Sequence, residues 1–117
     1  LNDYFVFYQP KDVVSGDFYW LTKIDNRVIL AVADCTGHGV PGAFMTLIGN
    51  SLLDKIVKSF KITQPAEILS HLHSDVFDTL KQKYNGNNYG MDAIVISITP
   101  TEKNTSLIEF AGAKNSI

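Results

Sequence analysis

Two short stretches of the chain place an aspartate beside glycine at the edge of an apolar run, and aspartates in such places could bind a cation. Asp17 lies in the sequence SGDFYW (residues 15–20), and Asp34 lies in ADCTGHGVP (residues 33–41). The apolar residues 28–33 before Asp34 are typical of a buried strand. A carboxylate at the end of such a strand is costly unless it is paired. A second aspartate nearby would complete an oxygen-rich cation site.

The elements that must position these aspartates are expected to form a hairpin. Residues 18–24 and 27–33 are rich in β-branched, aromatic and aliphatic residues, which favours two strands, and residues 25–26 predict a two-residue turn. Each aspartate then lies at the end of the hairpin away from the turn. Two close carboxylates repel each other, and a divalent cation removes that cost. We therefore predict a cation site, with a turn residue at Asp17 and a helix cap at Asp34 as the alternative.

Beyond Pro41 the apolar residues recur every four positions, which predicts a helix packed on a core. Gly49 inside this helix indicates close packing or a weak point. A second helix is expected after Thr63, a candidate N-cap, with Pro65 in its first turn. The apolar stripes consist of Phe44, Ile48, Leu52, Ile56 and Phe60, with Leu47, Leu53 and Val57 beside them, and then of Ile68, Leu69, Leu72, Val76, Phe77 and Leu80.

The order of the elements indicates the fold class. An aromatic strand is expected at residues 4–8, and two further strands at residues 91–98 and 107–113 follow the helices after a polar loop at residues 85–88. Grouped strands and grouped helices favour an α+β fold with an antiparallel sheet over alternating βαβ units. The two helices would cover one face of the sheet, and the other face would need a second layer.

Composition limits the class of protein. The 117 residues, 45% of them hydrophobic, are enough for one domain with a packed core. A net charge of -2 and a pI of about 5.8 argue against nucleic acid as the main partner. The single cysteine excludes an internal disulfide framework and suits a reducing cytoplasm. Because the chain starts at Leu1 and stops directly after an apolar segment, we expect it to be a fragment of a larger protein.

Several other residues leave alternatives open. His38, between two glycines, could be a general acid, a hydrogen-bond donor to phosphate or a turn residue, and the turn is favoured. Cys35 could be a nucleophile, but packing as a small apolar side chain is favoured. Asp92 could bind a metal ion, but a position at the end of a loop is favoured. His71 and His73 are two positions apart on a predicted helix, so they cannot chelate one ion well and are expected at the surface.

Four segments together resemble a known family. They are VSGDFY (residues 14–19), ADCTGHGVPGA (residues 33–43), YGMDA (residues 89–93) and FAGAKN (residues 110–115). They are similar to the metal-dependent Ser/Thr protein phosphatases of the PPM (2C) type. Within these, the resemblance is to the bacterial branch that includes the sporulation stage II protein E and phosphatases that regulate stress-response sigma factors. It spans nearly the whole chain and is specific because both aspartate motifs occur together.

The resemblance implies a fold, a site and a reaction. Such domains are α-β-β-α sandwiches, here partial, with two ions, Mn²⁺ or Mg²⁺, at one end of the sheets. Asp34 matches the acid that bridges both ions, the backbone carbonyl of Cys35 matches the next ligand, and Asp17 matches the acid on the second ion. Water held between the ions would attack the phosphorus of phosphoserine or phosphothreonine. Asp17 and Asp34 are therefore the expected catalytic residues.

The resemblance also implies partners, and the chain departs from it in one respect. The family has further metal-binding acids, in a TDG-like and a DD-like segment that would follow the last strand, and they are absent here. Residues 1–117 would therefore be the truncated N-terminal portion of the phosphatase domain, and we expect weak metal binding and little activity from these residues alone. The implied partners are a phosphorylated protein substrate, with an anti-sigma-factor antagonist as one candidate, and an upstream sensor domain. The implied location is the cytoplasm, even where the full-length protein is anchored upstream in a membrane. The oligomeric state stays open, a dimer included.

Two rival functions belong to other classes. A non-catalytic phosphatase-like domain would act by protein association, and the full-length protein would then lack the remaining acids. A nucleotide-binding domain would use residues 37–39 as a phosphate loop, and the lack of lysine in that loop argues against it.

Overall fold

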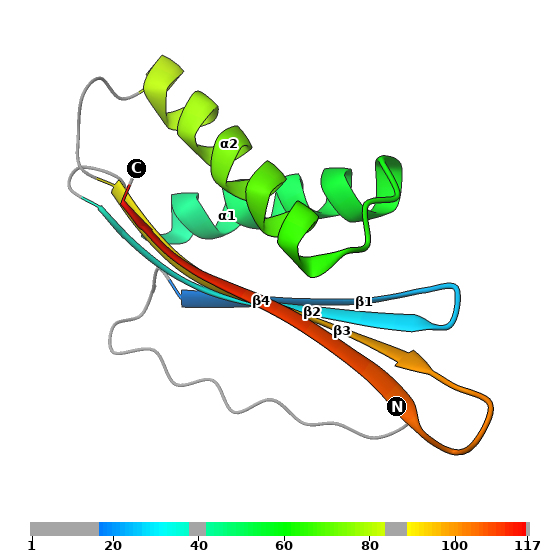
Figure 1. Cartoon of the computed structure of the whole chain (residues 1–117). Helices are drawn as coiled ribbons and strands as arrows, with labels where there is room; N and C mark the ends of the chain where they lie inside the picture. Colours follow the sequence, from blue (N-terminus) through cyan, green and yellow to red (C-terminus); the bar gives the residue numbers. More distant parts are fainter. Residues whose placement is uncertain (1–16, 38–41, 84–88, 117) are drawn as a thin grey trace.

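The computed structural model describes residues 17–37, 42–83 and 89–116, which form a four-stranded antiparallel sheet with helices on one face (Figure 1). The spatial order of the strands follows the sequence, and the strands are β1 (Asp17–Ile24), β2 (Arg27–Gly37), β3 (Tyr89–Pro100) and β4 (Ser106–Ser116). Between β2 and β3 the chain forms α1 (Gly42–Leu53), the π-helix η1 (Asp54–Ser59) and α2 (Pro65–Lys83). This arrangement confirms the α+β fold class and the placement of two helices on one face.

The β1–β2 hairpin confirms the predicted turn. Ile24 lies opposite Arg27, and Asp25 and Asn26 form the turn between them. Asp25 has a φ of 55°, a left-handed conformation that aspartate tolerates, so the turn forms without glycine. Strand β2 runs to Gly37, four residues beyond its predicted end. Asp34 therefore lies inside the strand and not at its end.

The core lies between the helices and the inner face of the sheet. Along β1 the burial alternates, so Phe18 and Trp20 face the helices while their neighbours do not. Helix α1 crosses β1 closely, because a Cβ atom on Gly49 would lie 2.3 Å from Cζ of Phe18. The prediction of close packing at this glycine is confirmed. The other fully buried apolar side chains are Ile29, Leu53, Ile56, Val57, Ile68, Leu72, Val76 and Val95.

The first helix departs from the predicted period of four. From Asp54 the chain winds as a π-helix, which has a wider turn than an α-helix and shifts the following residues around the axis. Ile56 and Val57 are fully buried, whereas Phe60, predicted in the stripe, is 56% exposed. Leu47, on the other side of α1, is 68% exposed. The stripe therefore continues through Leu53 into η1 and does not reach residue 60.

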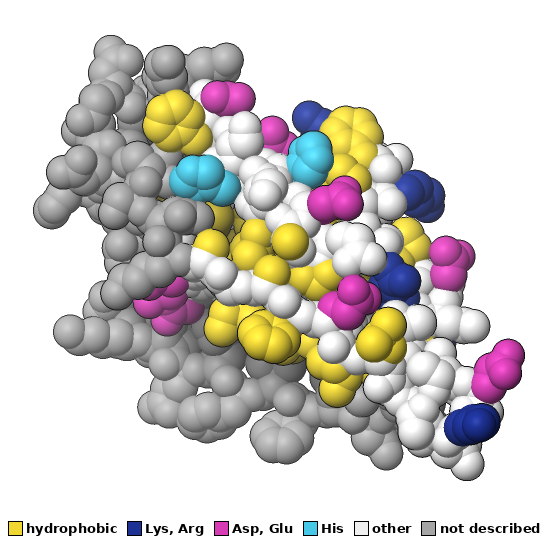
Figure 2. Space-filling model, in the orientation of Figure 1, with side chains coloured by type: hydrophobic (Ala, Val, Ile, Leu, Met, Phe, Trp, Pro, Cys, Tyr) yellow, Lys and Arg dark blue, Asp and Glu magenta, His cyan; other side chains and the backbone are white. Residues whose placement is uncertain are grey.

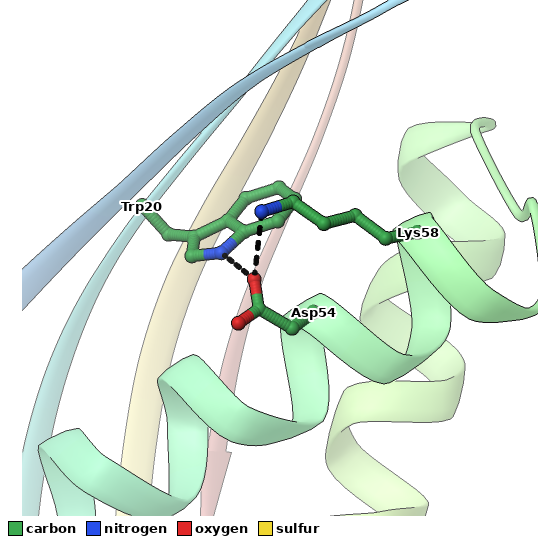
Figure 3. Close-up of polar contacts among 3 residues, drawn as sticks. All are labelled: Trp20, Asp54 and Lys58. Carbon is green, nitrogen blue, oxygen red and sulfur yellow. Dashed lines mark hydrogen bonds and ion pairs between the residues drawn. The ribbon is translucent and has the colours of Figure 1, made fainter.

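A polar contact joins η1 to the sheet (Figure 3). The Trp20 indole Nε1 donates a hydrogen bond to Oδ1 of Asp54 at 2.9 Å. Lys58, one turn later, forms an ion pair with the same oxygen at 3.4 Å, and its Nζ lies 5.9 Å from the centre of the Trp20 ring. The indole of a buried side chain thus has its polar group satisfied at the edge of the core.

The second helix confirms its stripe but not its cap. Four residues of the predicted stripe are buried, whereas Phe77 is 42% exposed and the side chain of Leu80 lies outside what the structure describes; the buried four are Ile68, Leu69, Leu72 and Val76. The helix starts at Pro65, and the carbonyl of Gln64 accepts the first hydrogen bond, from the Ile68 N–H at 2.9 Å. Thr63, predicted as the N-cap, lies one residue too early, and its hydroxyl accepts a hydrogen bond from Arg27 instead. Tertiary contact has replaced the local capping role.

The outer face of the sheet is apolar and is not covered by the described residues. Its exposed large hydrophobic side chains, 43% to 76% accessible, are Tyr19, Val32, Ile94, Ile108 and Phe110. Figure 2 shows hydrophobic side chains at the surface along the sheet, below the two helices. The expected strand at residues 4–8, Pro41 and the loop at residues 85–88 lie outside the described residues. No helix in the described part is long and apolar enough to cross a membrane.

Candidate active site

Three aspartates lie in one row across three neighbouring strands. Asp17 of β1 is opposite Asp34 of β2, and Asp34 is opposite Asp92 of β3. All three are exposed, and they alternate with the buried positions on the helix side of the sheet. Because neighbouring strands are about 4.8 Å apart, Asp34 lies close to Asp17 and to Asp92, which are two strands from each other. The row lies at the end of β1 farthest from the hairpin turn.

The register that brings Asp17 opposite Asp34 is determined by the apolar residues next to them. Phe18 lies opposite Ala33 and Trp20 lies opposite Ala31, and all four side chains are buried under the helices. A slip of one residue would turn one strand's apolar set out to solvent. The two-residue turn allows the same pairing, so core packing and turn length both support it.

The aspartate pair is electrostatically strained. The carboxyl groups of Asp17 and Asp34 hydrogen-bond to each other, and this contact is the main cause of a raised pKa of Asp34. Burial and the negative charges of Asp17 and Asp92 raise this pKa further. The ionised form of Asp34 is therefore disfavoured in the protein without a cation, and a bound cation would favour it.

The donor set fits part of a coordination shell for a hard divalent cation. Carboxylate oxygens suit Mg²⁺ and Mn²⁺ better than Zn²⁺. Within residues 17–37, 42–83 and 89–116, however, no group of three or more His, Cys, Asp or Glu side chains is arranged to hold a metal ion. Cys35 follows Asp34 directly in β2, opposite Met91. Its backbone carbonyl as a ligand stays a prediction, as do the ligand roles of Asp17 and Asp34.

Asp92 lies where the sequence alone did not clearly place it. A position at the end of a loop was favoured, next to a strand expected from residue 91, but β3 begins two residues earlier, at Tyr89, so Asp92 lies inside the strand and beside Asp34. The pairing of β2 with β3 spans two helices and has no short turn to define its register. The only sequence signal for this position was the similarity of the YGMDA segment to the phosphatase family.

The histidines have different environments. His71 is exposed on α2, as expected. His73 is half-buried, and its Nδ1 is buried without a hydrogen-bond partner among the described residues, so its expected surface position was wrong. His73 directly follows Leu72, a buried residue of the α2 stripe. The buried face of α2 is therefore wider than a repeat of every four residues predicts. His38, like the side chain of Cys35, lies outside what the structure describes.

Comparisons with known proteins agree with this geometry. A family model described as Stage II sporulation protein E (SpoIIE) matches residues 24–113, well over half of the chain. The solved SiaA-PP2C domain of Pseudomonas aeruginosa matches with a TM-score of 0.71 and 31% sequence identity. That match covers 93% of this chain and 41% of the solved chain, so this chain spans about two-fifths of its length. No curated protein matches.

Proposed function

Because the chain belongs to the stage II sporulation protein E family and shares the fold of PP2C domains, we propose that it forms part of a metal-dependent protein phosphatase. The observation that carries this proposal is the cross-strand pair of Asp17 and Asp34, whose carboxyl groups are within hydrogen-bonding reach. The parent reaction would be hydrolysis of phosphoserine or phosphothreonine in a protein that takes part in bacterial signalling.

Asp17 and Asp34 would hold two Mn²⁺ or Mg²⁺ ions, together with the carbonyl oxygen of Cys35. Bound ions of this kind lower the pKa of a water molecule and stabilise charge on phosphoryl oxygens. The aspartates must be ionised to bind, so protons compete with the cation for Asp34. Both side chains are exposed on the sheet, which leaves room for a phosphorylated side chain on a protein surface.

We propose that residues 1–117 supply only the first part of the phosphatase domain. The matched solved chain is more than twice as long, and the remaining metal-binding acids would come from the region without a counterpart here. We therefore expect weak cation binding and little turnover from this chain alone. A longer segment of the parent protein would bind Mn²⁺ more tightly and hydrolyse a phosphoprotein.

The test compares Asp34→Asn with Asp78→Asn, which removes an exposed aspartate from α2. In the longer segment, Asp34→Asn should abolish Mn²⁺-dependent turnover, while Asp78→Asn should leave it unchanged. In this chain, Mn²⁺ should selectively broaden the NMR signals of residues beside Asp17 and Asp34, and Asp34→Asn should remove the effect. Full turnover in the Asp34→Asn variant would contradict the proposed bridging role.

The small number of clustered carboxylates in the described part favours a second candidate, a phosphatase-like domain that acts only by protein association. The same experiment separates the two. A longer segment that binds no Mn²⁺ and hydrolyses no phosphoprotein would support the association domain.

A further inference from the structure

A second polar site lies at the other end of the β1–β2 hairpin. It is a cleft of about 300 Å³, at the lower end of the range for small-molecule sites. Strand β1 has eight residues, so the cleft is roughly 23 Å from the aspartate row. It is lined by Ile24, Asp25, Asn26, Arg27, Thr63 and Thr99.

Arg27 is held in a fixed orientation within this cleft. Its Nε donates to Oγ1 of Thr99 at 3.1 Å, and its Nη1 donates to Oγ1 of Thr63 at 2.7 Å. The threonines belong to β3 and to the segment before α2, so they restrain the guanidinium from two sides. Ordering a long side chain in advance lowers the entropy cost of binding a ligand.

The charge of Arg27 is not balanced by these contacts. Both partners are neutral hydroxyls, and no carboxylate of the described residues lies within 4.0 Å of its nitrogens. A guanidinium carries five N–H groups, and the two hydrogen bonds leave the others without a partner in the described part of the chain. A half-buried cation with free donors is the group that proteins use to bind carboxylate and phosphate.

The neighbouring polar groups add donors to the same place. The hydroxyls of Thr63 and Thr99 accept hydrogen bonds from Arg27, and each also carries a hydrogen that it could donate to a ligand. The Asn26 amide at the turn is a further donor. Asp25 also lines the cleft, and its exposed carboxylate opposes the binding of an anion.

We propose that this cleft binds the oxyanion of a small phosphate or carboxylate ligand, with Arg27 as the main contact and Thr63 and Thr99 as hydroxyl donors. The site is separate from the aspartate row, and the proposal does not depend on the proposed phosphatase function. The alternative is that Arg27 only connects the segment before α2 to the sheet, and in that case the cleft would bind no anion.

The test is an NMR titration of the chain with inorganic phosphate, without divalent cations and with chloride at matched ionic strength. We expect saturable shifts of the amide signals of residues 24–27, 63 and 99. Arg27→Gln should weaken phosphate binding about tenfold, because it removes the charged fork. Lys23→Gln removes an exposed positive charge from the same hairpin and should leave the affinity unchanged. Parallel titrations with acetate distinguish a phosphate from a carboxylate ligand.

Three results would overturn the proposal: no saturable shift in the unmodified chain, equal weakening by Lys23→Gln, or unchanged binding by Arg27→Gln. Because Arg27→Gln also removes the threonine contacts, Arg27→Lys provides a second variant that keeps the charge and loses the fork. It should bind phosphate more weakly than the unmodified chain. A phosphate-dependent rise in melting temperature, absent with chloride, gives a second measurement that does not depend on any variant.

Discussion

Asp34 is the residue at which fold stability and proposed function conflict. Its pKa is raised by the hydrogen bond with Asp17, by burial and by the charges of Asp17 and Asp92. A carboxyl group with a raised pKa contributes stability below its ordinary pKa and loses that contribution as the pH rises through the raised value. At neutral pH the ionised Asp34 therefore destabilises the metal-free protein. A site that binds cations needs this destabilising charge.

We expect Asp34→Asn to stabilise the metal-free chain at pH 7. The amide removes a negative charge and can still donate a hydrogen bond to Asp17. The gain should be below about 1 kcal/mol, because the carboxylates are exposed and solvent screens them. Urea denaturation measures it, with Asp78→Asn as the matched control. A lower free energy of unfolding for Asp34→Asn would show that the pair is not repulsive.

The same pair predicts a pH dependence. The stability difference between Asp34→Asn and the unmodified chain should shrink as the pH falls toward the ordinary aspartate value of 3.8, because Asp34 becomes protonated. Urea denaturation of both proteins between pH 7 and the acid range measures this difference. A constant difference across that range would mean that Asp34 titrates normally.

At the scale of the elements, the contact of α1 with β1 depends on the absence of a side chain at position 49. Gly49→Ala would favour the helix by up to about 1 kcal/mol on propensity alone. The new Cβ, however, would lie 2.3 Å from Cζ of Phe18, which is 5% exposed and confined by the core. We expect a net loss of stability of about 1–3 kcal/mol from overpacking.

A double-mutant cycle checks this prediction by thermal or urea unfolding. Phe18→Leu removes the ring that blocks position 49, so Gly49→Ala should cost less in that background than in the unmodified chain. Equal costs in both backgrounds would mean that α1 does not rest on Phe18.

The hydrogen bond between Asp54 and Trp20 connects the π-helix to the sheet (Figure 3). Because Trp20 is the single tryptophan of the chain, its fluorescence is a probe of this contact. Asp54→Ala should cost about 1 kcal/mol and change the Trp20 emission, because the indole N–H loses its acceptor. Asp54→Asn keeps an acceptor oxygen and should have a smaller effect. Lys58→Ala removes an exposed ion pair and the contact of Nζ with the Trp20 ring, and should cost no more than about 1 kcal/mol. A tryptophan spectrum that is unchanged in Asp54→Ala would contradict the contact.

At the scale of the whole molecule, the sheet has one covered face and one apolar face that the described residues leave exposed. Phe110 and Ile108 on the outer face of β4 are 76% and 62% exposed. Soluble domains rarely leave such contiguous apolar surface in contact with water. A second layer over this face, expected from the sequence, stays a prediction.

We expect the 117-residue chain to bind a hydrophobic dye or to self-associate through this face. Phe110→Ser with Ile108→Ser should reduce both effects with little loss of stability, because these side chains are exposed. Dye fluorescence and sedimentation measure the outcome, and Leu47→Ser, at an exposed position on α1, is the control. A longer segment of the parent protein should bind less dye. A monomer that binds no dye would show that the face is already covered.

The sequence by itself determined the local part of this protein. The β1–β2 hairpin follows from alternating side chains and a two-residue turn, and this hairpin alone places Asp17 opposite Asp34. The stripe of α2 follows from periodicity in the same way. Only the tertiary structure decided the position of Asp92, the π-helical winding after Leu53 and the contacts of Arg27 with Thr63 and Thr99. The Asp92 and Arg27 contacts join residues far apart in the chain, and they depend on packing across the sheet that no short-range pattern encodes. The π-helical winding is local, but the apolar repeat of every four residues did not predict it.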